Sequence, residues 1–515
     1  MRKTLLILSL FLIGFTELSA QKSKVSWGTK AGLTITDAAP EFEILGTVNG
    51  NYYTLVKHFS SFQNKTSKIC TRLTLLKFDG SHNLMFSKDI IPESGSGFLK
   101  AIAYQDHFQF FYQGLDEKKK IALYTQEIGL EGNELSVPQL IDSESPTKPG
   151  FETYNIELFD NDKYLVSYNF QYDQKSESIS LNSKSIVIVF SRMYQKIFES
   201  EIGAVTKDSK ILFSQLFGAD NGNLVFLNTS PGKAKNEFKN QIAEYNYETK
   251  EYRKIDLGIT DRNLKFCQNE NQFILISLAS REEVEASVKL LFQNVDRESF
   301  KTDNAIEIDL NNNNEGSYIA STEEFSDSKS KEIKSLKKFY LSNIQAKKNG
   351  NIILRINEST INGTKHISNT GNVLFVNVDV YGKYVWSKMI QRQNQFAETN
   401  PDFASVLSFE IGGNMYFLFN DVIDNQKADG TNPSFVAKPM NVQKPQTTIV
   451  SWVGISSTGK FSKGVIEDIS NLERSLYFNP ELSKIDSNGV GVLLLMGIDK
   501  TKLGYKLGTI KFSID

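Results

Sequence analysis

Short apolar runs separated by polar turns recur along the whole chain, and Gly371–Ile390 shows this pattern most clearly. There an apolar run, Val373–Val378, is followed by a polar turn at Asp379–Lys383 and by a second apolar run. Runs of strand length bounded by Gly and Asp predict a β-hairpin. A similar order of residues recurs at Thr71–Ile90 and, more loosely, at Ile449–Ile469. The pattern therefore predicts a fold built from copies of one small sheet.

Dividing the chain at these signals predicts about eight four-stranded units, with seven as the alternative. Tight turns rich in Asn, Asp and Gly join the first two strands of most units. The units span Phe42 to Ile91, Phe98 to Ile141, Tyr154 to Ile202, Ile211 to Leu257, Leu264 to Ile308, Phe339 to Gln391, Ala404 to Ile469 and Tyr477 to Phe512.

The last unit contains only three predicted strands, at Tyr477–Ile485, Val490–Ile498 and Leu503–Phe512, and the start of the chain offers the fourth. Lys24–Ile35 resembles the second strand of the hairpin described above, because Trp27 takes the place of Trp386, and no partner strand precedes it. A repeat fold that closes on itself can complete its last unit with a strand from the other terminus. We therefore expect the N-terminal strand to close a ring.

Units of this size resemble the blades of a β-propeller, which has four to eight of them. The hairpin is also similar to the Asp-x-x-Gly-x-x-x-Trp pattern of exported bacterial β-propeller repeat proteins, which Asp379, Gly382 and Trp386 match. The resemblance implies an all-β propeller of four-stranded blades. It implies no particular activity, because unrelated activities share this fold.

Composition supports the all-β interpretation. Aromatic residues make up 11% of the chain, including 36 Phe and 20 Tyr, and they favour strands. The net charge of -2 argues against a nucleic-acid-binding protein. The two cysteines, Cys70 and Cys267, fall in different units. A disulfide between them is compatible with export, but two buried thiols on strands are the favoured interpretation.

The N-terminus has the order of a secretory signal peptide. Arg2 and Lys3 precede an apolar stretch, Leu5–Phe15, and small residues at Ser19 and Ala20 predict cleavage before Gln21. Residues 1–20 are then the signal peptide and 21–515 a single propeller domain. No Cys follows the cut and no later stretch is predicted to span a membrane. These features predict a periplasmic or secreted protein and leave the choice open.

The predicted connections differ in length on the two faces of the ring. Connections between second and third strands, such as Ser60–Lys68 and Asp421–Gln446, are long, as is the low-complexity crossing between units at 311–337. Long loops on one face of a scaffold indicate an interaction surface. Its candidate contact residues are Tyr318, Phe325, Phe396, Phe435, Lys233 and Lys235.

Catalytic and metal-binding patterns are not evident in the sequence. The four His residues lack metal-ligand spacing. Asp421, Asp424 and Asp429 precede Gly430, but their spacing departs from that of a helix-loop-helix calcium site. We therefore predict no catalytic residue, metal or cofactor, and a non-catalytic scaffold or accessory subunit that binds an envelope protein. The alternative is a carbohydrate-active propeller that binds or hydrolyses glycans.

Overall fold

The structure is a computed structural model of the chain. It describes residues 24–34, 41–61, 68–91, 97–118, 120–144, 153–159, 163–170, 184–202, 213–220, 223–231, 238–260, 264–269, 271–279, 289–310, 337–347, 350–361, 367–390, 392–397, 405–427, 439–441, 448–468, 476–499 and 502–512. No helix among these residues is long and apolar enough to cross a membrane.

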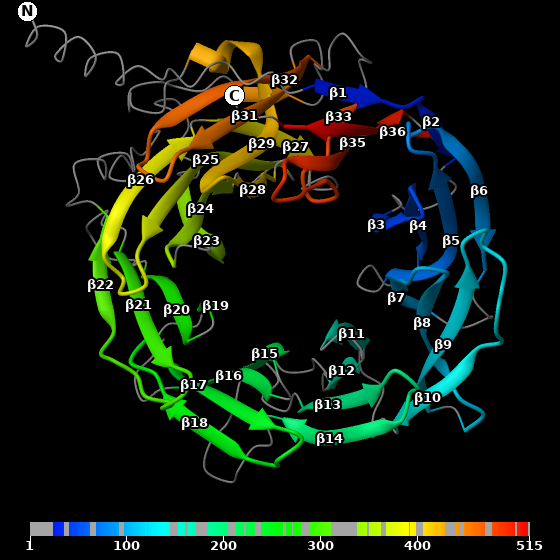
Figure 1. Cartoon of the computed structure of the whole chain (residues 1–515), viewed down its shortest axis with the longest axis horizontal. Coiled ribbons are helices and arrows are strands. Elements are labelled where there is room, and N and C mark those ends of the chain that lie inside the picture. Colours follow the sequence, from blue (N-terminus) through cyan, green and yellow to red (C-terminus); the bar gives the residue numbers. More distant parts are fainter. Residues whose placement is uncertain are drawn as a thin grey trace, which may run out of the picture.

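The described strands form a ring of eight antiparallel blades, which confirms the predicted eight-bladed β-propeller rather than the seven-bladed alternative (Figure 1). The first strand of each blade lies nearest the central axis and the fourth lies at the circumference. Blades 1 to 4 contain β3 (Glu41–Val48), β4 (Asn51–Ser61), β5 (Lys68–Phe78) and β6 (Leu84–Ile90); β7 (Gly97–Ala103), β8 (His107–Leu115), β9 (Ile121–Gly129) and β10 (Gln139–Glu144); β11 (Thr153–Phe159), β12 (Lys163–Phe170), β13 (Lys184–Ser191) and β14 (Lys196–Ile202); and β15 (Phe213–Asp220), β16 (Asn223–Pro231), β17 (Phe238–Asn246) and β18 (Tyr252–Asp256).

The second half of the ring is more varied. Blades 5 to 7 contain β19 (Lys265–Gln268), β20 (Gln272–Ala279), β21 (Lys289–Asp296) and β22 (Ile306–Asp309); β23 (Lys337–Ala346), β24 (Ile352–Ile361), β25 (Ile367–Val378) and β26 (Tyr384–Ile390); and β28 (Leu407–Ile411), β29 (Asn414–Val422), β31 (Thr448–Ile455) and β32 (Phe461–Asp468). Blade 8 contains β33 (Tyr477–Phe478), β34 (Lys484–Ile485), β35 (Val490–Asp499), β36 (Lys502–Lys511), β1 (Lys24–Trp27) and β2 (Ala31–Thr34). The remaining elements are β27 (Gln393–Ala397), the 3-10 helix η3 (Ile423–Lys427) and β30 (Pro439–Asn441).

The N-terminal strand closes the ring as predicted. β1 pairs antiparallel with β36, with Trp27 opposite Gly508, and β2 pairs with the other end of β36. The predicted single strand is divided because the chain around Gly28 lies against the turn that carries His82. A Cβ at Gly28 would lie 2.0 Å from the carbonyl oxygen of His82. Only glycine permits this approach.

Two predicted bounds need correction. The first strand of blade 8 was predicted as Tyr477–Ile485, but it is divided into β33 and β34. Between them the hydroxyl of Ser483 donates to the carbonyl of Asn479 at 2.7 Å, so local side-chain bonds replace the ladder. The predicted loop Ser60–Lys68 is shorter, because β4 extends to Ser61 and β5 begins at Lys68.

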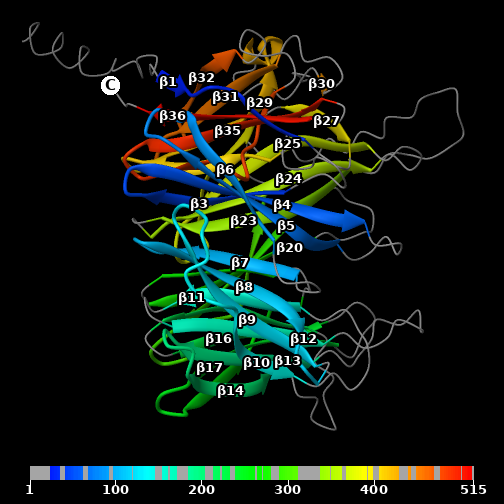
Figure 2. The ribbon, with the colours of Figure 1, turned by 90° about the vertical axis from the view of Figure 1, so that its right-hand side faces the viewer.

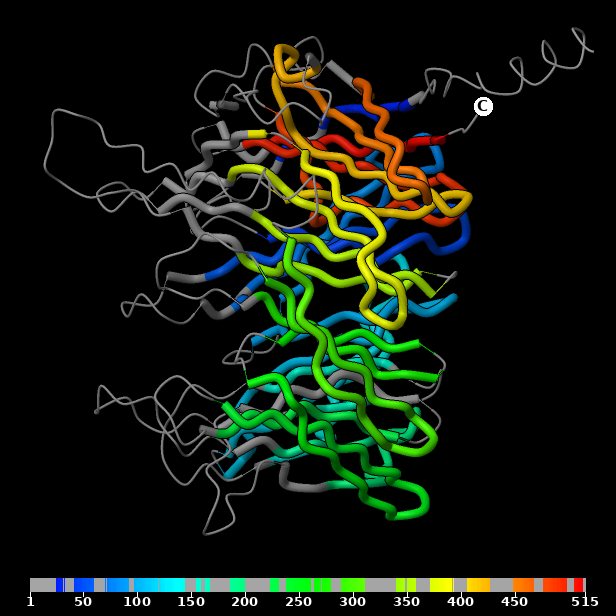
Figure 3. The backbone as a smooth tube through the Cα atoms, turned by 90° about the vertical axis from the view of Figure 1, so that its left-hand side faces the viewer, coloured from blue at the N-terminus to red at the C-terminus, as the bar shows by residue number. Residues whose placement is uncertain are grey.

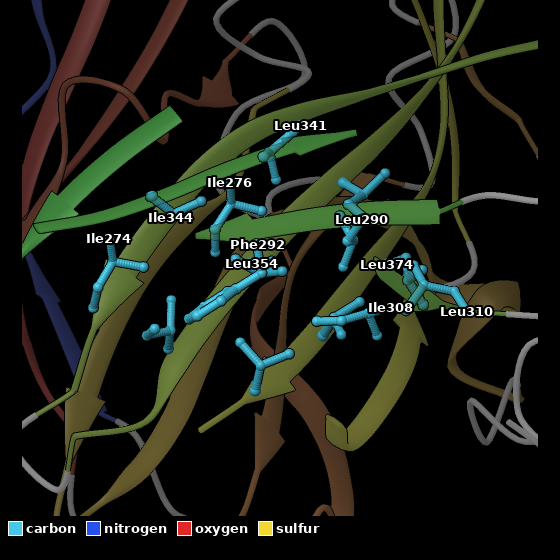
Figure 4. Packing of buried hydrophobic residues seen from close by; sticks show 14 of the residues in the cluster. Ile274, Ile276, Leu290, Phe292, Ile308, Leu310, Leu341, Ile344, Leu354 and Leu374 are labelled. Atoms are coloured by element: carbon cyan, nitrogen blue, oxygen red, sulfur yellow. The ribbon is translucent and has the colours of Figure 1, made fainter. Parts of the chain in front are cut away.

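Hydrophobic clusters lie between successive blades. The cluster between blades 5 and 6 joins Ile274, Ile276 and Leu290 to Leu341 and Leu354 (Figure 4). The middle strands of a blade, its second and third, contribute to the clusters on both sides. In β31, a third strand, all eight residues are therefore buried. No blade can bury both faces alone, so closure of the ring is part of folding.

The two faces of the ring differ in their connections. We call the face with the first-to-second and third-to-fourth strand turns the turn face, and the opposite one the crossing face. On the turn face Asn49 and Gly50 have φ of 51° and 75°, which is the backbone of a type I′ hairpin turn. Figure 2 shows β4 running toward the crossing face, and Figure 3 shows blades 5 to 7 in succession from the other side.

Candidate functional site

Most of the predicted contact residues lie outside the described part of the chain. Phe396 is the exception, because its backbone belongs to β27. There it is opposite Ser368 of β25 in an antiparallel ladder. The residues outside the described ranges are Tyr318, Phe325, Phe435, Lys233 and Lys235.

β27 belongs to an extension of blade 6 on the crossing face. β24 and β25 continue beyond the blade, and β27 pairs with the added part of β25. β30, from the connection between β29 and β31, then pairs parallel with β27, with Asn394 opposite Met440. The result is a six-stranded sheet in place of four strands (Figure 2). Asp421–Gln446, predicted as a loop, thus contains η3 and β30.

A polar group lies directly beneath this extension, at the end of the interface between blades 6 and 7. The interface is apolar along Ile353, Phe375 and Phe419. Because side chains alternate along a strand, the next residues on the same faces are Arg355 on β24 and Asp421 on β29. Arg392, just before β27, lies beside them. We call Arg355, Arg392 and Asp421 the polar cap.

The two arginines hold the segment that enters blade 7. Nη1 of Arg355 donates to the carbonyl of Val406 at 2.8 Å, and Nε donates to the hydroxyl of Ser342 at 2.9 Å. Nη1 of Arg392 donates to the carbonyl of Ser405 at 3.2 Å. Arg392 is only 1% exposed, and burial lowers the pKa of its guanidinium to about 10.

Similar contacts in other blades show that part of this arrangement is a general feature of the ring. The backbone N–H of Tyr154, in the first strand of blade 3, donates to Gln113 of β8 at 3.1 Å. The side chain of Asn420, on β29, bonds both backbone groups of Phe478 in blade 8. A polar side chain on a second strand thus repeatedly holds the first strand of the next blade. In blade 6 this position is occupied by Arg355, whose planar guanidinium has more N–H donors than these contacts use.

Asp421 anchors η3, whereas Asp429 and Gly430 of the same sequence pattern lie outside the described residues. Its Oδ1 accepts from the side-chain amide of Asn425 at 2.7 Å and from the N–H of Val422 at 2.8 Å. Burial raises the pKa of this carboxyl to about 6, although Asn425, Val422 and Arg392 oppose the shift. Among the described residues, no group of three or more His, Cys, Asp or Glu could hold a metal ion.

Exposed side chains lie beside the polar cap on the innermost strands. Tyr340 on β23 is 45% exposed, and its hydroxyl accepts from the amide of Asn357 at 3.3 Å. Glu481, between β33 and β34, is exposed and accepts a hydrogen bond from the hydroxyl of Ser405. This combination of an aromatic ring, a guanidinium and a carboxylate is suited to binding a polar ligand. Sequence reasoning missed it because its residues come from blades 6 and 8, which are far apart in the sequence.

One histidine network superficially resembles a catalytic triad. The Thr74 hydroxyl lies 2.9 Å from Nε2 of His58 and donates to Asp89 at 2.7 Å. Because the hydroxyl proton points to the carboxylate, Nε2 must donate to Thr74 and cannot act as its base. Arg72 donates to the other ring nitrogen at 3.2 Å. The network is therefore arranged to join strands of blade 1, not to activate a nucleophile.

The structure contains no disulfide between the two cysteines, and Cys70 is buried as predicted whereas Cys267 is only partly buried. Cys70 on β5 and Cys267 on β19 are free thiols in blades 1 and 5. Burial raises the pKa of Cys70 to about 11 and that of Cys267 to about 12, so both stay protonated at neutral pH.

Comparison with known proteins finds solved structures that share low sequence identity and low TM-scores with this chain. Its sequence matches no family model and no curated protein. A prolyl endopeptidase structure is 11% identical with a TM-score of 0.38, covering 90% of this chain and 55% of its own. The β-propeller domain of the Trilobed protease from Pyrococcus furiosus is 11% identical, with a TM-score of 0.34 and coverages of 72% and 100%. The polysaccharide lyase Uly1 is 9% identical, with a TM-score of 0.40 and coverages of 83% and 91%.

Proposed function

We propose that the protein is a non-catalytic, exported β-propeller that acts as a scaffold or accessory subunit by binding an envelope protein through its crossing face. The observation that carries this proposal is the extension of blade 6. β27 and β30 come from two different connections and form an ordered sheet on the face with the longer connections. Ring closure does not need this sheet, since it lies outside the four-stranded blade. Ordered structure on a scaffold's loops is where binding sites concentrate.

The polar cap supports the same interpretation. Burying the charged groups of Arg392 and Asp421 costs free energy. Their position under the extension therefore favours a function that requires this sheet to be held in one place. Export rests on the N-terminal sequence, with its basic start, apolar stretch and small residues before Gln21. Periplasmic and secreted locations are both consistent with it. Glycan binding is a second candidate, favoured by the exposed Tyr340 and Glu481 beside Arg355.

The proposal is tested by breaking the extension while leaving the ring intact. Asn394 lies between two partner strands, opposite Thr370 and Met440. Asn394→Pro removes a backbone donor there and should separate β27 from its neighbours. Asn394→Ser keeps the backbone and is the matched control. We expect Asn394→Pro to retain the thermal unfolding of the ring, within about 1 kcal/mol.

Partner capture is the functional readout. Each variant is tagged, crosslinked in its native cells and purified, and co-purifying proteins are quantified by mass spectrometry. We expect one envelope protein to accompany the wild type and Asn394→Ser at constant stoichiometry, and to be lost with Asn394→Pro. Equal recovery with all three variants would place the binding surface elsewhere. If Asn394→Pro unfolds the ring, Met440→Pro on the outermost strand, β30, replaces it in the same comparison.

A further inference from the structure

We propose that Tyr340, Arg355 and Glu481 form a binding site for an acidic saccharide, meaning a sugar chain that carries carboxylate groups. The site lies on the inner strands of blades 6 and 8, at the crossing-face end of the interface between blades 6 and 7. It does not depend on the proposed protein partner, because every residue that defines it belongs to the propeller body.

Arg355 supplies the positive charge. Two of its nitrogens are committed, to Ser342 at 2.9 Å and to Val406 at 2.8 Å, and these bonds fix the plane of the guanidinium. Among the described residues, Nη2 has no hydrogen-bond partner and the side chain makes no direct ion pair. A planar, immobilised guanidinium with a remaining donor is suited to a carboxylate.

The surroundings of Arg355 leave its charge incompletely compensated. Burial is the main influence on the guanidinium and lowers its pKa, while Glu481 and Tyr340 act in the opposite direction. The buried Arg392 lies close enough for the charge of Arg355 to lower the pKa of Arg392. A bound carboxylate would relieve this repulsion.

Tyr340 offers an aromatic surface beside this charge. Its side chain is 45% exposed although it lies on the innermost strand of blade 6. The contact at 3.3 Å between its hydroxyl and Asn357 holds one end of the ring in place. An exposed aromatic ring fixed by its polar end can pack against the apolar C–H face of a sugar.

Glu481 makes a simple anion an unsuitable ligand. Its Oε1 accepts the hydroxyl of Ser405, and the carboxylate is exposed. A sulfate would meet this negative charge without offering a hydrogen-bond donor, and a phosphate would bring up to two negative charges toward it. A sugar acid offers hydroxyl donors for Glu481 and a carboxylate for Arg355 in one molecule. Cation, acceptor and aromatic ring together therefore favour a uronic acid unit.

The test is titration calorimetry of the purified mature protein with three probes. These are trigalacturonate, the neutral galactotriose, and tricarballylate, which carries carboxylates without a sugar ring. The variants are Tyr340→Ala and Glu481→Gln, both at exposed positions that leave the hydrogen bonds of Arg355 intact. Tyr381→Ala is the control, since Tyr381 is 71% exposed on the opposite, turn face of the same blade.

We expect trigalacturonate to bind at least about tenfold more tightly than either other probe, because only it satisfies both charged groups. Tyr340→Ala and Glu481→Gln should each weaken it by about fivefold or more, and Tyr381→Ala should not. No saturable binding, equal binding of galactotriose, or equal binding of tricarballylate would overturn the assignment. So would trigalacturonate binding that neither Tyr340→Ala nor Glu481→Gln weakens.

Discussion

The contribution of the N-terminal strands to ring closure can be tested with Gly28→Ala, which adds a single Cβ atom. A Cβ at Gly28 would lie 2.0 Å from the carbonyl oxygen of His82, 2.5 Å from its carbonyl carbon and 2.8 Å from its Cβ. Non-bonded carbon atoms pack at about 3.5 Å or more, so backbone must move by about 1 Å or more. The neighbouring bonds at risk are Gly28 N–H to Leu507 at 2.9 Å and Thr29 N–H to Asn83 at 3.3 Å.

The expected cost follows from these contacts. Overpacking costs about 1–3 kcal/mol, and each lost hydrogen bond about 1 kcal/mol, so we expect about 2–5 kcal/mol at the seam. The matched control is Gly80→Ala in the turn that precedes β6. There the nearest atom to a new Cβ is the carbonyl oxygen of Gly50 at 3.7 Å, an ordinary contact. This control should be neutral or stabilise by up to about 1 kcal/mol.

Hydrogen exchange at the seam is the sensitive assay. A large ring has a large unfolding entropy, so its melting temperature responds weakly, by about 1 °C per kcal/mol for a chain of this size. Local opening instead responds exponentially, and 2–5 kcal/mol corresponds to about 30-fold to several-thousand-fold faster exchange. The acceleration should appear in β1, β2 and β36. Equal exchange there in Gly28→Ala and Gly80→Ala would refute the reasoning.

Two further predictions concern pH. Burial lowers the pKa of His82, which is 1% exposed beside Thr509, so the unfolded chain takes up this proton more readily than the native state. Stability should therefore fall as the pH drops below about 6.5, and denaturant titrations should show less of this fall in His82→Asn, since Asn tolerates the φ of 66°. Asp421 changes stability with pH in the opposite direction, because burial raises its pKa from 3.8 to about 6. It therefore contributes up to about 3 kcal/mol to the free energy of unfolding at low pH, and this contribution is lost as the pH rises through 6. Asp421→Asn keeps an acceptor for Asn425 and should remove this dependence; an unchanged pH profile would show that Asp421 does not titrate with folding.

The sequence by itself determined the repeat and its closure. Strand formation depends on local alternation, and turns such as Asn49-Gly50 depend on residues that tolerate positive φ, so both are visible without tertiary structure. The vacancy in the last unit and the match of Trp27 to Trp386 predicted which strand would fill it. Both tryptophans lie on fourth strands, in agreement with the predicted match between Trp27 and Trp386.

Only the tertiary structure revealed the extension of blade 6, the polar cap and the proposed saccharide site beside them. β27 and β30 have the sequences QNQFA and PMN, too short and too polar to show a strand period, and they pair because blades 6 and 7 bring their connections together. No pattern in the sequence marks Arg355 or Arg392, and Asp421 was noted only for its spacing to Asp424 and Asp429, because charged residues usually lie at the surface. The burial of Arg392 and Asp421, the partial burial of Arg355, and the position of Tyr340 and Glu481 beside them arise from contacts between separate blades. A one-dimensional pattern records which face of a strand is apolar, but not which distant side chain will meet it.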